Sequence, residues 1–447
     1  MKKFLICSLL AAVLLAGANY LPAAEPLLKV AVLSDIQHYD QPGDWGYGNL
    51  EKAFAMLQNR QIGVLVIAGD LVENANHPGA FKSYRALMKK YFKNNMPELV
   101  ACAGNHDVYN NPLQPVEKCL DVFCRNLQIP RDNPLLQNFQ GFDFITVHDE
   151  RTDDYCSDTL QKLQKLLDQA VQRSKDKPVF VVSHYPLPDT VAGSFGSKKM
   201  HKLRKVLNKY PQVVHLSGHT HYPLEDERAI WQKEFTAITT STLSYGCLDD
   251  KIVSNTCNGI LPFAREVVQF MIFEIYADRI VIARYNAEEK REIKPAARWV
   301  IDLPYKPSEA KYTEARAAGR TAPAFPENAR LLLRYDYGFH YLIFDAAKHD
   351  DMVFMYKIRV LLPGDKSGWQ EHYSENFVAG FYRLERTRGK RESFRLPEYA
   401  LVNNKLNRIE VYPVENFGKA GKPLVLEYPM PALRSAAKVP KNIAPQD

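Results

Sequence analysis

The chain has 447 residues, of which 46% are hydrophobic, and carries a formal net charge of +7 at pH 7. This length exceeds what one hydrophobic core usually organises, and the apolar content is that of a globular protein, so we expect two domains. A charge of +7 on so long a chain is a mild bias towards anionic partners, and we predict no specific nucleic-acid binding.

The N-terminal segment has the pattern of a secretory signal. Lys2 and Lys3 precede an apolar run from Phe4 to Ala18 that ends in small residues. The run is shorter than the roughly 20 apolar residues that span a bilayer, and no second such run follows. We predict a signal peptide over residues 1–24, cleaved near 18–24, no transmembrane segment after cleavage, and a periplasmic or secreted protein.

Six cysteines remain after removal of the predicted signal peptide. Cys119 with Cys124, and Cys247 with Cys257, are spaced to close short loops in an oxidising compartment, but the sequence fixes neither pairing. Cys102 lies within an apolar run, where we expect a small buried thiol. The chain has no Cys-x-x-Cys pair that would indicate a structural zinc site.

From residue 28 onward, short β-branched runs alternate with amphipathic helical patterns, which is typical of βαβ units. The expected strands cover residues 27–35, 63–70, 98–105, 178–184 and 212–219. The expected helices cover residues 49–60, 80–94, 158–175 and 200–210. Two further apolar runs, 235–245 and 267–285, alternate over a longer stretch, and we predict an antiparallel continuation of the sheet there, as in a two-sheet sandwich.

The composition changes to proline and alanine over residues 304–327, which we interpret as a linker that follows an α/β domain over residues 25–303. Beyond it, residues 351–362, 407–414 and 423–430 alternate apolar and polar side chains with a period of two. This pattern predicts a small β-sandwich domain over residues 328–435. Residues 436–447 are expected to form a flexible tail.

Each of the five expected βαβ strands ends in a residue type that binds metals. These residues are Asp35, Asp70, Asn105, His184 and His219, and His221 follows two positions later. The first three are separated by 35 residues each, about the length of one βαβ crossover. Because open α/β sheets bind ligands at the carboxyl ends of their strands, we expect these side chains to converge on one edge.

Carboxylate, amide and imidazole groups together suit divalent metal ions. Six ligands are too many for one ion with an open position, so the set indicates two ions with one shared aspartate. Order and spacing give that bridging role to Asp70. Any one of these residues could instead be an Asp that caps a helix or a His that is simply packed in the core. That alternative does not explain why six such residues stand at successive strand ends.

Five short motifs stand in the order of the calcineurin-like metallophosphoesterase superfamily, and the resemblance spans residues 28–285. They are DIQ (35–37), GDLVEN (69–74), GNHD (104–107), SHYP (183–186) and GHTH (218–221). The resemblance implies an α/β/β/α sandwich fold. It implies a first metal bound by Asp35, Asp70 and His221, and a second bound by Asp70, Asn105, His184 and His219. It also places His106 beside the leaving group.

The first motif departs from the superfamily pattern D-x-H, because Gln37 stands where the histidine is usual. An amide oxygen favours manganese or ferrous iron over zinc, although zinc stays an alternative. The D-x-Q variant resembles manganese-dependent pyrophosphatases that act on ADP-ribose and CDP-alcohols. The competing interpretation makes His38 the ligand, but alternation along an extended segment turns it away. Glu73 stands where purple acid phosphatases carry a tyrosine ligand, so we expect no tyrosinate-ferric centre.

We therefore expect a phosphoesterase that hydrolyses phosphodiester or pyrophosphate bonds of a small phosphorylated substrate, by attack of a hydroxide that bridges two metals. His106 would assist the leaving oxygen, and Asp107 would fix its tautomer or, alternatively, cap a loop. Trp45 and Tyr185 are candidate stacking surfaces, for which simple loop packing is the alternative.

Two other functions compete with this one. One is a phosphomonoesterase or nucleotidase that uses the same metals, because fold and metal site are shared across many chemistries. The other is an inactive or weakly active binding protein whose β-sandwich contacts a glycan or cell-surface polymer. Since every expected ligand precedes residue 222, we also expect the sandwich to be dispensable for the chemistry.

Overall fold

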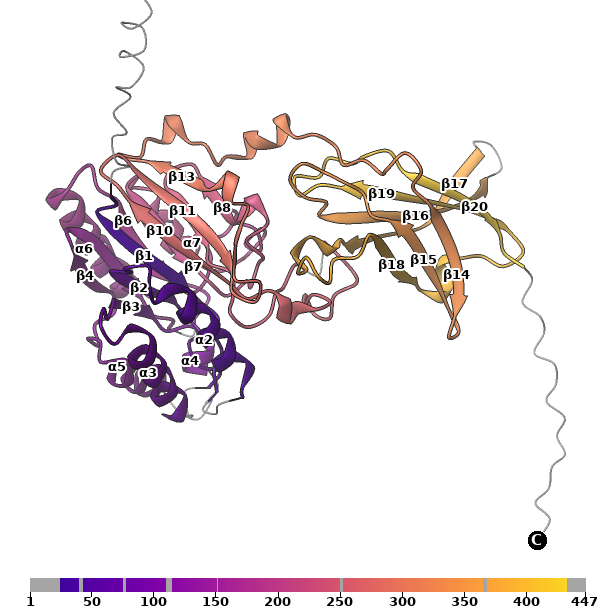
Figure 1. Ribbon diagram of the computed structural model, residues 1–447. Helices are drawn as coiled ribbons and strands as arrows, with labels where there is room; N and C mark the ends of the chain where they lie inside the picture. Colours follow the sequence, from indigo (N-terminus) through magenta and orange to yellow (C-terminus); the bar gives the residue numbers. More distant parts are fainter. Residues whose placement is uncertain are drawn as a thin grey trace, which may run out of the picture.

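The computed structural model describes residues 25–39, 43–74, 78–109, 115–150, 152–249, 252–364 and 368–431. An α/β part and an all-β part lie side by side in it (Figure 1). The predicted signal peptide and C-terminal tail lie outside the described residues. Within the described ranges, no helix is both long and apolar enough to cross a membrane.

The first sheet of the α/β part has seven strands. They are β1 (Leu28–Leu33), β2 (Val64–Ala68), β3 (Glu98–Cys102), β10 (Gln269–Ile275), β11 (Arg279–Asn286), β12 (Arg291–Ile293) and β13 (Trp299–Asp302). Their order is β12-β11-β10-β1-β2-β3, with β13 paired to β11. Strands β1, β2 and β3 are parallel, and the antiparallel hairpin β10–β11 extends the sheet from β1, as predicted.

The second sheet has six strands. They are β4 (Leu135–Phe139), β5 (Phe142–Val147), β6 (Val179–Ser183), β7 (Val213–Ser217), β8 (Ile230–Gln232) and β9 (Thr236–Thr239). Their order is β4-β5-β6-β7-β9-β8. Strand β9 pairs in parallel with β7, so the antiparallel continuation predicted for residues 235–245 is wrong at this position. The chain reverses direction between β7 and β9 by way of the short strand β8, which pairs antiparallel with β9.

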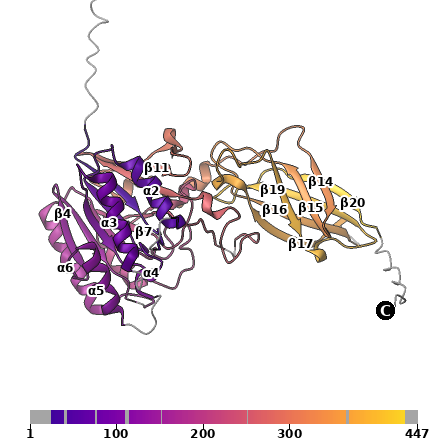
Figure 2. The same cartoon turned by 60° about the horizontal axis from the view of Figure 1, so that its bottom comes forward.

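Helices cover the outer face of each sheet (Figure 2). On the first sheet lie α2 (Trp45–Leu57), α3 (Pro78–Phe92) and α5 (Val116–Leu127), and α4 (Asn105–Tyr109) is a single short turn. On the second sheet lie α6 (Ser157–Arg173) and α7 (His201–Leu207). A third apolar cluster fills the space between the two sheets. This layering confirms the α/β/β/α sandwich.

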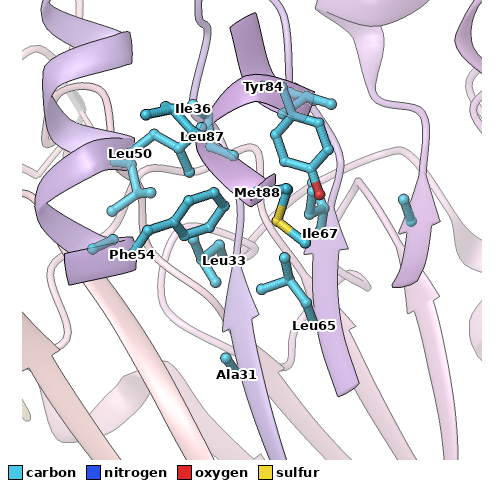
Figure 3. Packing of buried hydrophobic residues seen from close by; sticks show 14 of the residues in the cluster. Ala31, Leu33, Ile36, Leu50, Phe54, Leu65, Ile67, Tyr84, Leu87 and Met88 are labelled. Carbon is cyan, nitrogen blue, oxygen red and sulfur yellow. The ribbon is translucent and has the colours of Figure 1, made fainter. Parts of the chain in front are cut away.

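The two faces of the central strands explain why they lack a polar alternation. Ala31, Leu33, Leu65 and Ile67 face the helices, where they pack with Phe54 and its neighbours (Figure 3). The intervening valines of β1 and β2 face the second sheet. Strands buried on both faces are expected to be almost continuously apolar. Each fully buried valine, leucine or isoleucine of these strands contributes about 1.5–3 kcal/mol to folding.

The all-β part consists of two antiparallel sheets that enclose an apolar cluster, which confirms the predicted β-sandwich. One sheet contains β14 (Leu331–Asp336), β15 (Phe339–Asp345) and β18 (Arg391–Leu396). The other contains β16 (Met355–Gly364), β17 (Gly368–Val378), β19 (Leu406–Val414) and β20 (Leu424–Pro429). The exact domain boundaries and the linker role of residues 304–327 stay predictions.

The cysteines of the described part are all free. Cys119 and Cys124 lie five residues apart on the same helix, α5. At 1.5 Å of rise per residue their Cα atoms are about 7.5 Å apart along the axis, which is too far for a disulfide. Cys102 is buried at the end of β3, as predicted.

Candidate metal centre

The strand ends of the two sheets meet at one place. Asp35 follows β1, Asp70 follows β2, and Asn105 begins α4 after β3, so three of the expected ligands come from the first sheet. His184 follows β6, and His219 follows β7, so the remaining ligands come from the second sheet. The carboxyl ends of the parallel strands therefore face each other across the layer between the sheets.

Two carboxylates and one imidazole form the compact centre of the site. Ligand atoms of Asp35, Asp70 and His184 all lie within 4.8 Å of one another, and all three residues are buried. His184 Nε2 lies 3.1 Å from Asp70 Oδ2 and 4.0 Å from Asp35 Oδ1. His221 Nε2 lies 3.0 Å from Asp35 Oδ1, on the other side of that carboxylate.

Asn105 joins the two sides of the site. Its Oδ1 atom lies 3.1 Å from His184 Nε2 and 3.0 Å from His219 Nδ1. The six residues that the sequence places at strand ends thus form one connected cluster.

The backbone at the site is strained. Five of the expected ligands have a positive φ: Asp35 (48°), Gln37 (48°), Asp70 (52°), His219 (68°) and His221 (51°). The left-handed region costs a residue with a side chain on the order of 1–3 kcal/mol, and such residues cluster at functional sites. Hydrogen bonds hold the first of these turns, since Ile36 N and Gln37 N both donate to Asp70 O at 2.9 Å.

Three glycines, each directly before an expected ligand, leave room for ligand side chains from other strand ends. A Cβ on Gly69 would lie 2.2 Å from His184 Nδ1, and one on Gly104 would lie 2.3 Å from Asp70 Oδ1. A Cβ on Gly218 would lie 2.3 Å from Asp35 Oδ2. Each glycine of the GD, GN and GH motifs therefore accommodates a ligand side chain from a neighbouring strand end.

The charges of the buried groups are strongly coupled. Burial opposes ionisation of Asp70, but the neighbouring His184 outweighs it and lowers the pKa of Asp70 to about 2. Burial likewise opposes protonation of His184, but Asp70 raises the pKa of that imidazole to about 10. Burial, reinforced by His184, lowers the pKa of His219 to about 3. A metal ion that binds here replaces the proton of His184.

The backbone orients two of the imidazoles towards the centre. His184 Nδ1 lies 2.9 Å from Ala68 O, and His221 Nδ1 lies 2.8 Å from Tyr245 O. Both contacts leave Nε2 directed at the carboxylates. Hydrogen bonds of this kind fix the tautomer and orientation of metal-binding histidines.

Gln37 and His38 point to different surroundings. Gln37 Oε1 accepts a hydrogen bond from Ser244 Oγ, next to the residue that holds His221. The ring of His38 is buried and lies 3.1 Å from both Asp44 Oδ2 and Ala80 O. His38 therefore contacts the residues at the starts of α2 and α3, and the ligand role of Gln37 stays a prediction. Ser244 and Tyr245 carry no motif, so sequence reasoning missed them.

His106 is held by Glu73. The backbone N–H of His106 donates to Asp70 Oδ1 at 2.8 Å, and its Nδ1 lies 3.3 Å from both Glu73 O and Glu73 Oε2. Burial opposes protonation, but the hydrogen bond and charge of Glu73 raise the pKa of His106 to about 9. Sequence reasoning noted Glu73 only as a missing tyrosine and did not find this contact.

Asp107 is fully buried, and its carboxylate accepts hydrogen bonds from the backbone. The donors are Gly104 N at 2.9 Å, Val72 N at 3.1 Å and Leu71 N at 3.4 Å. Burial raises the pKa of Asp107 to about 7, and the charge of Asp70 adds to this effect. These contacts connect the turns after β2 and β3. They are the contacts expected if Asp107 caps a loop, which is the alternative to orienting His106.

Aromatic side chains border the cluster. The Tyr185 ring is buried and lies 4.2 Å from the His219 ring, so Tyr185 packs beneath the site. The Trp45 ring is half-buried and lies 6.2 Å from Tyr245, whose ring is 4.4 Å from that of His221. The guanidinium of Arg265 lies 5.1 Å from the Trp45 ring. Trp45 is thus the better placed of the two candidate stacking residues.

The donor set fits divalent metal ions. Buried carboxylates, an amide oxygen and imidazole nitrogens converge within a few ångströms, and two of the histidines are oriented by backbone carbonyls. The glycine cradles show that the fold is arranged to bring these particular side chains together. Such a mixture of oxygen and nitrogen donors suits manganese, iron or zinc.

A protein-family model described as calcineurin-like phosphoesterase matches residues 28–223. No curated protein matches the chain. Solved structures similar to the chain include a dimetal phosphatase from Danio rerio, which is 13% identical with a TM-score of 0.40; the match covers 59% of this chain and 97% of that chain.

Two further solved structures are similar at the same level. A purple acid phosphatase from yellow lupin (Lupinus luteus) seeds is 11% identical with a TM-score of 0.46, over 64% of this chain and 55% of that chain. An anchor protein of the inner membrane complex of Plasmodium is 16% identical with a TM-score of 0.40, over 64% and 90%. At these identities and TM-scores the likenesses add nothing to the family match.

Proposed function

We propose that the chain, of which residues 28–223 match the family model of calcineurin-like phosphoesterases, hydrolyses phosphodiester or pyrophosphate bonds with two divalent metal ions. The observation that carries the proposal is the cluster of Asp35, Asp70 and His184, whose ligand atoms lie within 4.8 Å of one another. An aspartate flanked by imidazoles can be shared by two divalent ions about 3.5–4 Å apart, which is the spacing in two-metal hydrolases.

The ligands divide around Asp70. Asp35, Gln37 and His221 would hold the first ion with Asp70, and Asn105, His184 and His219 would hold the second ion with the same carboxylate. The chemistry that bound divalent ions supply is acidification of water and neutralisation of charge on phosphoryl oxygens. The oxygen donor of Gln37 favours manganese or ferrous iron at the first position.

His106 is the proton donor in this proposal. Its backbone N–H is fixed on Asp70, which places the imidazole beside the bridging carboxylate, and Glu73 holds Nδ1. From this position the ring can pass a proton to a leaving oxygen. Glu73 takes the orienting role that the sequence suggested for Asp107.

Trp45, Tyr245 and Arg265 contribute the part of the site that contacts the substrate away from phosphorus. Trp45 and Tyr245 offer ring faces next to His221, and Arg265 is exposed at the rim. A planar leaving group with a negative charge would meet both a stacking surface and a cation there. A pyrophosphate ester of a nucleoside has both features.

Activity with bis-p-nitrophenyl phosphate and p-nitrophenyl phosphate, measured with added manganese, tests the proposal. The diester should be the better substrate, and Asp70→Asn should abolish its hydrolysis, whereas the same substitution at the exposed Asp278 should not. Preference for the monoester would favour the phosphomonoesterase alternative. Absence of hydrolysis of both esters and of ADP-ribose would favour a binding protein.

A further inference from the structure

A buried polar contact joins the β-sandwich to the α/β part. Asn416 lies in the turn between β19 and β20, and its side chain is almost completely buried, as is that of Asp226. Asn416 Nδ2 donates to Asp226 Oδ1 at 2.8 Å, and its Oδ1 accepts from Arg320 Nη2 at 3.2 Å. The cation and the anion on either side fix the orientation of the amide.

Asp226 passes this contact on to the residue next to His221. Its carboxylate binds Arg228 through Nε at 3.1 Å and Nη2 at 2.6 Å. Arg228 Nη2 also donates to the hydroxyl of Tyr222 at 3.0 Å, and the buried Tyr222 directly follows His221 in the chain. A continuous series of hydrogen bonds thus runs from the sandwich to Tyr222, the residue that directly follows an expected metal ligand.

Apolar packing supports the same connection. Tyr222 and Val267 belong to a cluster with Phe354 and Phe381 of the sandwich. The guanidinium of Arg228 lies 4.6 Å from the Phe354 ring. Because the polar series crosses this apolar contact, it is shielded from water, where a hydrogen bond is worth more and a broken one costs more.

The loop that holds His221 from the other side is also fixed by the sandwich. Cys247 N donates to His221 O at 3.0 Å, and Tyr245 O contacts the ring. Further along this loop, Ser254 N donates to Asn376 O at 2.9 Å, and Asn255 Oδ1 accepts from Val378 N at 2.7 Å. The segment that follows His221 and the loop that contacts its ring are therefore both bonded to the β-sandwich.

We propose that the β-sandwich is a positioning element of the first metal site, and that Asn416 is a positioning residue that acts on His221 through Asp226, Arg228 and Tyr222. The inference rests on the metal centre of the proposed function but not on the choice of substrate. It is opposite to the expectation that the sandwich is dispensable, which considered only where the ligands lie in the sequence.

Asn416→Asp in the full-length protein tests the proposal. The substitution keeps the shape and the acceptor for Arg320, but it sets a carboxylate oxygen against Asp226 Oδ1. Titration with Mn²⁺ alone should show one class of site unchanged and the other weakened about 10-fold, the low end of the effect of groups that support metal ligands. His221→Ala identifies which class is the first site.

Asn407→Asp is the matched control, because Asn407 is also a buried amide of the sandwich but bonds only to its own turn, at Val402 and Lys405. It should lower the stability of the sandwich and leave Mn²⁺ binding unchanged. The reciprocal double variant, Asn416→Asp with Asp226→Asn, restores one donor and one acceptor and should recover part of the lost affinity.

Wild-type Mn²⁺ affinity at both sites in Asn416→Asp would overturn the proposal, and so would an equal loss in Asn407→Asp. If Asn416→Asp does not fold, Asn416→Ala removes the donor without adding a charge, and the same two outcomes apply. Because the readout is metal affinity, inactivity on every phosphate ester would refute the proposed function and leave this inference standing.

Discussion

Gly104→Ala probes how tightly the fold confines the carboxylate of Asp70, the proposed bridging ligand. A Cβ at this position would lie 2.3 Å from Asp70 Oδ1, 2.7 Å from Asp70 N and 2.7 Å from His184 Cγ, whereas real Cβ atoms essentially never approach closer than 3.0 Å. The Asp70 carboxylate or the end of β3 must therefore move by at least 0.7 Å. Metal–ligand distances deviate from their usual values by only about 0.2 Å, so a carboxylate displaced this far cannot bind the ions as before.

The expected effect on metal binding is larger than the effect on folding. Over-packing of this kind costs about 1–3 kcal/mol of unfolding free energy, which a domain of this size tolerates. Displacement of the proposed bridging ligand should weaken binding of both ions by about 100-fold or more. Loss of a residue that only supports a metal ligand lowers metal affinity by about 10- to 100-fold, and displacement of the ligand itself should cost at least as much. Gly104 has no positive φ, so the effect of alanine there is steric.

Metal content after purification and calorimetric titration with Mn²⁺ measure the effect, and urea denaturation measures the change in stability. Gly48→Ala is the control, because Gly48 lies within α2 and a Cβ there meets nothing within 4 Å. It should leave metal binding unchanged and stabilise the helix by up to about 1 kcal/mol. Binding of two ions with wild-type affinity by Gly104→Ala would show that the Asp70 carboxylate is not confined as described.

Three further outcomes are expected. His106→Gln should keep both metal ions and lose about 10²- to 10⁴-fold in turnover, because the proposed function makes His106 a proton donor and not a ligand. Gln37→His should bind zinc more tightly and reduce the advantage of manganese over zinc in activity, since an imidazole nitrogen replaces an amide oxygen. His215→Gln should make the stability of the protein less sensitive to acid. Burial lowers the pKa of His215 from 6.5 to about 3 in the folded protein. Because the unfolded chain therefore takes up a proton first, the free energy of unfolding decreases as the pH falls below 6.5. This one group accounts for about 3 kcal/mol between pH 7 and pH 4, measured by urea denaturation with a chelator present.

Each outcome has a clear opposite. Loss of metal from His106→Gln would make it a ligand. Full metal occupancy in Gln37→Ala, together with loss of the first ion in His38→Ala, would transfer the ligand role to His38. An unchanged difference in stability between pH 7 and pH 4 in His215→Gln would place the acid sensitivity in other groups, of which the buried His148 is the first candidate.

The sequence alone determined the layers of the fold and the candidate residues that the structure brings together in one cluster. Asp35, Asp70 and His184 could be predicted because each stands at the end of an apolar run, and the direction of a parallel strand decides which edge its end reaches. The β-sandwich could be predicted because a period of two extends over strands such as β16. These signals are local, so they survive without any knowledge of strand order.

Only the tertiary structure decided which side-chain and backbone groups surround the candidate cluster. Glu73 lies against His106 instead of Asp107, Tyr245 orients His221, and Asn416 reaches Asp226 across 190 residues of sequence. No periodic pattern indicates any of these contacts, and each contact is worth only about 1 kcal/mol on its own. Such contacts exist because the packing of two sheets and a second domain brings distant segments together. A local sequence pattern does not predict which distant segments will meet.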